Sequence, residues 1–258
     1  MRRKLTLVRN ALQIPLRLKQ NAFALAWAMC SLLLVFAAQA DESTYVLTTG
    51  VYNLSGGDVS NSHGLDVNIR QISDQGNLWF AWYRSPEQDV SQPRLGWDRS
   101  FDFSAWRLSP SMQIASNRFV GGSLSVETGD AWFVGAGLGR TNLQPYVNLN
   151  FDPNDAWMAS GGYRWSSLNS LSMQVVRDNR LNPDQQHVHM LYRTPLANNH
   201  RLTVDVLFKS GLVEDHFTRR TGLSVTYDWS EFFTRVAYDP IINFTPQTMW
   251  RMSVGTRF

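Results

Sequence analysis

The sequence predicts an all-β fold, a single up-and-down antiparallel transmembrane β-barrel of 14 strands, with 12 strands as the alternative. Three observations lead to this prediction. Segments of about 8 to 11 residues, in which apolar and polar side chains alternate, recur along residues 41–258 and match the pattern of membrane barrels. An export signal precedes them. The chain also ends on a strand that has one apolar face.

Residues 1–40 have the pattern of a secretory signal peptide. Basic residues are followed by an apolar run from about Ala22 to Ala37 and then by the small-residue cleavage motif Ala38-Gln39-Ala40. We place cleavage before Asp41, which assigns 41–258 to the barrel. An uncleaved anchor is the alternative, since a run of roughly 16 residues is near the lower limit for a membrane span.

Removing this signal changes the charge of the chain. The whole sequence has 24 basic and 21 acidic residues, and six of the basic residues lie in 1–40. The remaining 18 basic against 21 acidic residues give 41–258 a formal charge of −3. The basic character therefore belongs to the signal, and we expect no nucleic-acid partner. Cys30 is the only cysteine and also lies in the signal, so the barrel has no disulfide.

The last nine residues form a two-faced strand, because side chains alternate with period two. One face carries Trp250, Met252, Val254, Thr256 and Phe258, and the other carries Arg251, Ser253, Gly255 and Arg257. In these features the chain resembles the outer-membrane β-barrel proteins of Gram-negative bacteria, whose terminal strand is recognised by the barrel assembly machinery. The resemblance implies an outer-membrane location in the cell envelope, contact with outer-membrane lipids, and an assembly signal formed by Trp250, Met252, Val254 and Phe258. The oligomeric state stays open.

Fifteen segments have strand character, whereas a single-chain bacterial barrel has an even number of strands. They are 44–53, 64–73, 76–84, 93–103, 105–115, 118–127, 131–139, 145–151, 156–166, 170–178, 186–193, 202–209, 222–229, 232–239 and 250–258. We expect the surplus segment between 93 and 127, where Pro110 interrupts a strand and Arg99 falls on an apolar face. A bulge or a merged segment is expected there.

Aromatic residues gather towards the ends of the expected strands, as the two interfacial girdles of a membrane barrel require. A soluble β-sandwich can also be rich in tryptophan, but the export signal and the terminal strand favour the barrel. The tryptophans concerned are Trp79, Trp82, Trp97, Trp106, Trp132, Trp157, Trp165, Trp229 and Trp250.

The terminal strand also predicts the orientation, since it runs towards the periplasm. Residues 166–169 and 227–231 then become periplasmic turns, and 178–184, 211–220 and 240–248 become extracellular loops. These loops are short, so a receptor for large ligands has little loop material to use.

The inward faces carry charges of both signs and predict a small channel, or porin, for polar or anionic solutes. A structural barrel without a pore is the alternative, because arginines and carboxylates can satisfy one another in a confined lumen. The expected lumen-lining residues are Asp66, Arg70, Arg164, His187, His189, Arg193, Asp205, Arg220, Asp228, Arg235, Arg251 and Arg257.

A lipid-modifying acyl hydrolase or acyltransferase is a further alternative. His187 and His189 share one strand face, and Ser172 or Asp205 could lie nearby as the nucleophile or the orienting carboxylate. No signature of an outer-membrane lipase such as His-x-Ser-Asn occurs, so an enzyme is less favoured and no catalytic residue is assigned. The His187-x-His189 pair could bind a metal from one strand, and the acidic segments 150–155 and 178–184 could bind calcium, but each signal is weak. Segment 150–155 is foremost typical of turns, and we expect no metal and no cofactor.

Overall fold

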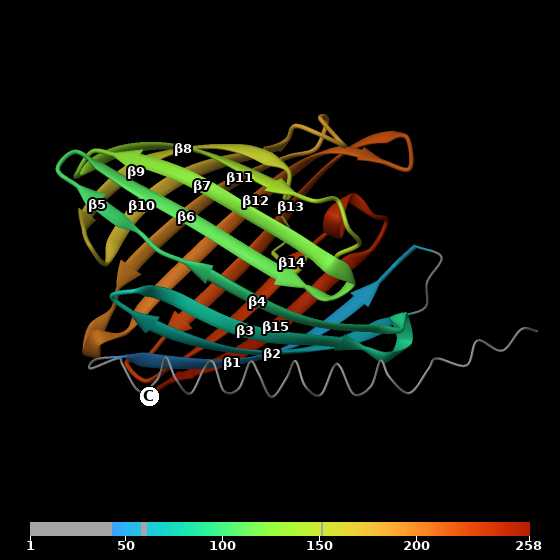
Figure 1. The fold of residues 1–258 in the computed structure, drawn as a ribbon, viewed down its shortest axis with the longest axis horizontal. Helices are drawn as coiled ribbons and strands as arrows, with labels where there is room; N and C mark the ends of the chain where they lie inside the picture. The colour runs from blue at the N-terminus through green and yellow to red at the C-terminus, as the bar shows by residue number, and fades with distance from the viewer. Residues whose placement is uncertain (1–42, 58–60, 151) are drawn as a thin grey trace, which may run out of the picture. The chain divides into compact units, whose positions relative to one another are not determined.

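The structure, a computed structural model, describes residues 43–57, 61–150 and 152–258, so the predicted signal peptide lies outside the described residues. Strands dominate this part of the chain (Figure 1). The strands are β1 (Thr44–Ser55), β2 (Ser62–Ser73), β3 (Gly76–Ser85), β4 (Val90–Asp98), β5 (Phe101–Phe103), β6 (Trp106–Ala115), β7 (Phe119–Thr128), β8 (Trp132–Thr141), β9 (Ala156–Ser166), β10 (Asn169–Asp178), β11 (Gln186–Pro195), β12 (Arg201–Val213), β13 (His216–Asp228), β14 (Phe232–Asp239) and β15 (Thr248–Arg257).

Four short 3-10 turns lie between strands: η1 (Pro86–Gln88), η2 (Ser116–Arg118), η3 (Ala197–Asn199) and η4 (Ile242–Phe244). No helix among the described residues is long and apolar enough to cross a membrane.

Each strand pairs antiparallel with its neighbours in sequence, and the first and last strands close the sheet. β1 pairs with β15 from Val46↔Arg257 to Ser55↔Thr248, and Figure 1 shows these two strands side by side. β5 continues β4, and both pair with β6, so the fifteen strand segments make 14 strands in the closed sheet. The predicted all-β, up-and-down barrel of 14 strands is confirmed.

The break between β4 and β5 falls at Arg99 and Ser100, opposite Pro110 of β6. Proline has no backbone N–H to give to a neighbouring strand, so the ladder is interrupted where it lies. The Arg99 N–H still donates to the Pro110 carbonyl at 3.2 Å. The irregularity expected near Pro110 is therefore confirmed.

The surplus segment, by contrast, is not between 93 and 127. Residues 145–151 were expected to form a strand, and no strand lies between β8 and β9 in the described part of that segment. The connection 142–155 instead carries apolar residues that anchor it inside the barrel, and these residues produce a strand-like alternation in the sequence.

The connections lie at two opposite rims. The terminal rim holds both chain ends of the sheet, where Tyr45 and Phe258 exchange backbone hydrogen bonds, together with the predicted turns at 166–169 and 227–231. The loop rim holds the connections 142–155, 179–185 and 240–247.

The predicted loop 211–220 is mostly strand. β12 runs to Val213 and β13 begins at His216, which leaves the two-residue turn Glu214-Asp215. These residues have φ values of 47° and 65°. Positive φ at both central residues is the geometry of a tight type I′ hairpin turn, so the two strands continue almost to the turn.

The outer face of the barrel is apolar over many strands, because alternate side chains of each strand point outward. Val51, Met112, Val134, Met173 and Val236 are all exposed, and they come from five different strands. The aromatic girdles are partly as expected. Trp106, Trp132 and Trp165 are exposed near the terminal rim, and Trp82, Trp157 and Trp250 are exposed towards the loop rim. Trp97 shares the outer face with its strand partner Met112 near the terminal rim, whereas Trp79 lies against Gly96 and lines the interior.

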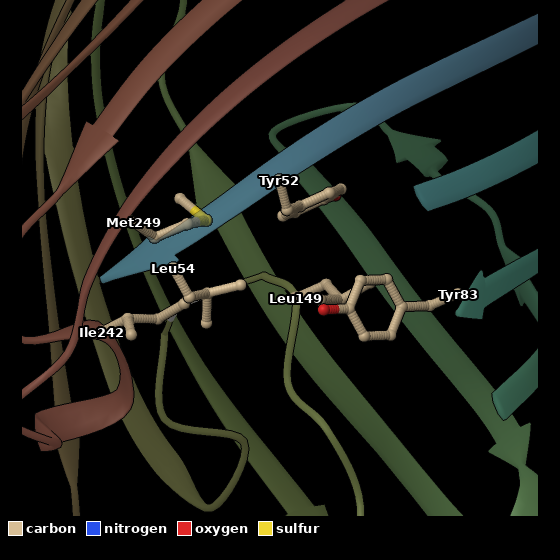
Figure 2. Close-up of a cluster of buried hydrophobic side chains, with 6 residues drawn as sticks. All are labelled: Tyr52, Leu54, Tyr83, Leu149, Ile242 and Met249. Carbon is tan, nitrogen blue, oxygen red and sulfur yellow. The ribbon is translucent and has the colours of Figure 1, made fainter. Parts of the chain in front are cut away.

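A buried apolar cluster occupies the interior close to the loop rim. Its members are Tyr52, Leu54, Tyr83, Leu149, Ile242 and Met249. Figure 2 shows the side chain of Leu149, from the 142–155 connection, among side chains of β1, β3, β15 and η4. Gly64 of β2 makes room for this packing, since a Cβ there would overlap the Tyr83 ring. The cluster therefore holds the connection in place at this end of the barrel.

Candidate functional site

Two cavities lined by inward-facing described residues form the candidate functional site. The first has a volume of about 690 Å³ and is lined by strands from most of the barrel, with Asp66, Arg70, Arg94 and Arg257 among its charged residues. The second has a volume of about 360 Å³ and includes His189, Arg193 and Asp205. Asn150, Asp152, Arg235 and Arg251 line both cavities.

We call the described residues 142–150 and 152–155 of the β8–β9 connection the inner loop, and they contact the barrel wall on several sides. Gln92 of β4 donates to the Val147 carbonyl and accepts from the Val147 N–H, each at 2.8 Å. Tyr146 stacks on Phe119 of β7 with 4.0 Å between ring centroids. Asn243 donates to the Asn148 carbonyl at 3.1 Å. The inner loop is thus fixed across the lumen by polar and apolar contacts.

The inner loop reaches the predicted histidine pair through Asp152. His187 Nδ1 lies 2.7 Å from Asp152 Oδ1, and His189 Nε2 lies 3.0 Å from the same oxygen. On its other side, His189 Nδ1 lies 3.0 and 3.1 Å from the two carboxylate oxygens of Asp205. Burial opposes ionisation of Asp152, but the hydrogen bonds and charges of both histidines outweigh it and hold the pKa of this carboxyl well below its usual range.

Asp155 fixes the end of the inner loop. It accepts hydrogen bonds from Thr141 Oγ1 at 2.5 Å, from the Thr141 N–H at 3.1 Å and from Arg180 at 2.9 Å. Burial alone would raise the pKa of Asp155, but the bonds from Thr141 and Arg180 outweigh this effect and lower it. Arg180 lies in the 179–185 connection, so the carboxylate links two loops of the same rim.

Two buried ion pairs stabilise the wall. Arg94 of β4 pairs with Asp66 of β2, and both side chains are largely buried. Lys209 donates to Asp239 at 2.7 Å and to the Ile241 carbonyl at 3.0 Å, with its side chain fully buried. Buried charges of this kind are costly unless they are paired.

The predicted arginines near the terminal rim are also paired. Arg257 donates two hydrogen bonds to Asp228, at 2.9 and 3.0 Å, and Arg201 donates a third at 2.8 Å. Arg164 donates to Glu127 at 2.6 Å and lies over the Phe133 ring. These groups form local networks at the rim.

Other predicted arginines face the cavities. Arg70 lines the first cavity and Arg193 the second, and neither forms a salt bridge within the described residues. Arg235 donates to Thr226 at 3.0 Å, and the Arg251 guanidinium lies 5.9 Å from the Tyr52 ring centroid. Arg220 lines neither cavity; it is exposed on β13 and donates to the Arg219 carbonyl.

Sequence reasoning did not identify Gln92, Arg94 or Tyr146 as interior residues. Arg94 follows Pro93, which blurs the alternation of that strand, and Tyr146 was assigned to a strand. Asp152 was assigned to turn chemistry. Asp152 contacts two histidines that lie 35 and 37 positions away in the sequence. A local sequence pattern does not predict contacts between such distant residues.

The arrangement expected of an acyl hydrolase is only partly present. Asp205 contacts His189, as the enzyme alternative requires. Ser172 of β10 makes no hydrogen bond to His187 or His189, both of which instead contact Asp152. The described residues thus place a carboxylate where that mechanism would need a nucleophile.

Three of the predicted assembly residues lie on the outer face of β15, and the fourth, Phe258, directly follows this strand. Trp250, Met252 and Val254 are exposed, and Phe258 is 67% exposed. Phe258 stacks on Tyr45 with 5.9 Å between ring centroids and an interplanar angle of 18°. The end of β15 is thus closed against the start of β1.

No protein-family model and no curated protein sequence matches the chain. Among solved structures, the chain is similar to the outer membrane protein Omp33 of Acinetobacter baumannii, with 10% identity and a TM-score of 0.51 over 85% of this chain and 100% of that chain. The NanC porin (8% identity, TM-score 0.45, 81% and 98% coverage) and the KdgM porin (12%, 0.44, 83% and 99%) also match. The likeness to Omp33 supports the barrel fold.

Proposed function

We propose that the chain is an integral outer-membrane β-barrel that forms a narrow channel for small polar or anionic solutes. The observation that carries the proposal is the group of arginines facing the cavities, namely Arg70, Arg193, Arg235 and Arg251. Guanidinium groups in a confined, partly hydrated lumen lower the energy of an anion relative to a cation of the same size.

The outer-membrane location is part of this proposal. It is supported by the apolar outer face, by the two groups of exposed tryptophans and by the barrel fold shared with Omp33. Outer-membrane lipids would cover the apolar band. The barrel assembly machinery would insert the chain through its terminal strand.

Planar-bilayer conductance of the purified barrel tests the channel proposal. We expect discrete conductance with a preference for anions. Replacing both Arg235 and Arg251 with glutamine should shift the reversal potential towards cation preference, because both guanidinium groups line the two cavities. Arg219→Gln is the matched control, since this exposed arginine lies in the β12–β13 hairpin and lines neither cavity. A selectivity that the double variant leaves unchanged would contradict the proposal.

A structural barrel without a pore is the second candidate. It is favoured by the apolar cluster around Leu149 and by the inner loop, which occupies the lumen near the loop rim (Figure 2). If this candidate is correct, the reconstituted protein gives no conductance above the lipid background. The double variant then has reduced stability without a new permeability.

A further inference from the structure

The side chains of Asp152, His187, His189 and Asp205 form a cluster. Both histidines in it contact the same carboxylate oxygen of Asp152. Asp152 Oδ1 faces a ring nitrogen of each histidine, at 2.7 and 3.0 Å. The carboxylate of Asp205 faces the other ring nitrogen of His189. A neutral imidazole has one N–H. If a neutral His189 donates it to Asp205, its Nε2 lone pair points at the carboxylate oxygen of Asp152. Either a second proton on His189 or a metal ion then has to lie between these two acceptors.

We propose that Asp152, His187 and His189 bind one transition-metal ion, with Zn²⁺ as the best fit, and that this ion fastens the inner loop to strand β11. The three donor atoms all lie within 4.8 Å of one another. Bonds of about 2.0–2.2 Å to a tetrahedral ion place donor atoms roughly 3.4 Å apart. On binding, the Asp152–His187 and Asp152–His189 separations of 2.7 and 3.0 Å open slightly, and His187 Nδ1 and His189 Nε2 move closer together.

Strand geometry supplies two of these donors. His187 and His189 are two residues apart on β11, so both side chains point into the barrel, and their ring centroids lie 6.3 Å apart. The His187 side chain is fully buried and stacks on Phe244, which fixes the plane of its ring. Two imidazoles and one carboxylate form a donor set that suits zinc and leaves a fourth position for water.

Asp205 is a positioning residue in this arrangement. A metal-bound histidine generally donates its other ring N–H to a carboxylate, which fixes its tautomer and raises its basicity. Asp205 has this relation to His189. The nearby Lys209 ammonium is paired with Asp239, so its charge is compensated and it does not compete for Asp152.

Zinc titration of the untagged, refolded barrel after treatment with a chelator tests the proposal. We expect one Zn²⁺ per chain by calorimetry and a rise in the midpoint of thermal unfolding, because a ligand that binds only the folded state stabilises it. Co²⁺ should give the visible absorption of a four-coordinate site with nitrogen donors. Neither readout depends on channel activity, so failure of the proposed function leaves this test intact.

Variants separate this site from other histidines. The pair His187→Gln and His189→Gln, and Asp152→Asn alone, should abolish stoichiometric binding, and Asp205→Asn should weaken it roughly tenfold or more. His200→Gln is the matched control, because His200 contacts Tyr227 at the terminal rim. Absence of saturable binding by the parent barrel overturns the proposal and assigns the cluster to a shared proton. Binding that survives in the double histidine variant overturns it as well. Should the variants fail to fold, the Co²⁺ spectrum of the parent decides.

Discussion

Gln92 and Val147 are 55 positions apart in sequence and exchange two hydrogen bonds, with the Gln92 side chain bonding both backbone groups of Val147 at 2.8 Å. This exchange imitates the pairing of two strands. It ties the inner loop to β4, while Asp152 ties the same loop to β11. The loop is therefore held at two separated points of the wall, and each point can be removed separately.

We expect Gln92→Ala to loosen the inner loop without unfolding the barrel. The variant loses both hydrogen bonds to Val147, which should weaken local attachment by about 1–3 kcal/mol. Amide hydrogen exchange of Val147 should then be roughly tenfold to a hundredfold faster. Gln113→Ala is the control, since Gln113 lines the first cavity from β6. Equal exchange rates at Val147 in both variants would show that Gln92 does not hold the loop.

Arg94 and Arg70 both line the first cavity, but they should respond differently to substitution by methionine. Arg94→Met leaves the buried Asp66 carboxylate without its partner and should cost about 3–5 kcal/mol of folding free energy. Adding Asp66→Asn to Arg94→Met should restore part of the loss, because no unpaired buried charge then remains. Arg70 has no salt bridge in the described residues, so Arg70→Met should affect ion selectivity more than stability. Unfolding in urea measures the stabilities. A stability loss in Arg70→Met as large as that in Arg94→Met would refute the distinction.

Much of the fold could be predicted because a strand in lipid carries its own two-residue periodicity. Met252 and Val254 alternate with Arg251 and Ser253, and this local pattern specifies which side faces outward. The interior depends on contacts between distant segments. The alternation around Val147 and Leu149 looks like a strand, although these residues pack into the lumen. A two-residue alternation of apolar side chains indicates that one side of a segment is packed against apolar groups. A strand and a loop packed inside the lumen can both produce this alternation.

The same limit applies to the candidate site. The alternation placed His189 and Asp205 on inward faces, and the structure brings them into contact. It could not place Asp152, because an aspartate followed by proline and asparagine is equally typical of a surface turn. Arg220 shows the opposite error. It has inward parity and pairs with the buried Lys209 of β12, but its own side chain is exposed.

Acid should release the end of the inner loop at Asp155. Because the folded-state pKa of this carboxyl is lowered, its bonds to Thr141 and Arg180 contribute stability above the ordinary carboxyl range near pH 4, and that stability is lost as the pH falls through the lowered pKa. Asp155→Asn should therefore be less stable than the parent near neutral pH, with the difference shrinking in acid. Thermal unfolding over a pH series measures it. Asp184→Asn in the neighbouring loop is the control. A difference that is constant with pH would rule out this linkage.

The aromatic chain end gives the last prediction. Phe258 directly follows β15, is exposed, stacks on Tyr45 and exchanges backbone hydrogen bonds of 2.8 and 3.0 Å with it. Phe258→Asp places a charge at a position expected to face the interface and removes the aromatic end of the strand, so we expect a lower yield of assembled barrel. Phe232→Asp is the matched control, because Phe232 is also exposed at the terminal rim but begins β14. Heat-modifiable gel mobility of the membrane fraction at low expression measures assembly. If Phe258 acts only through local packing, both variants should lose a similar amount of assembled protein; if it is part of an assembly signal, the loss should be much larger for Phe258→Asp.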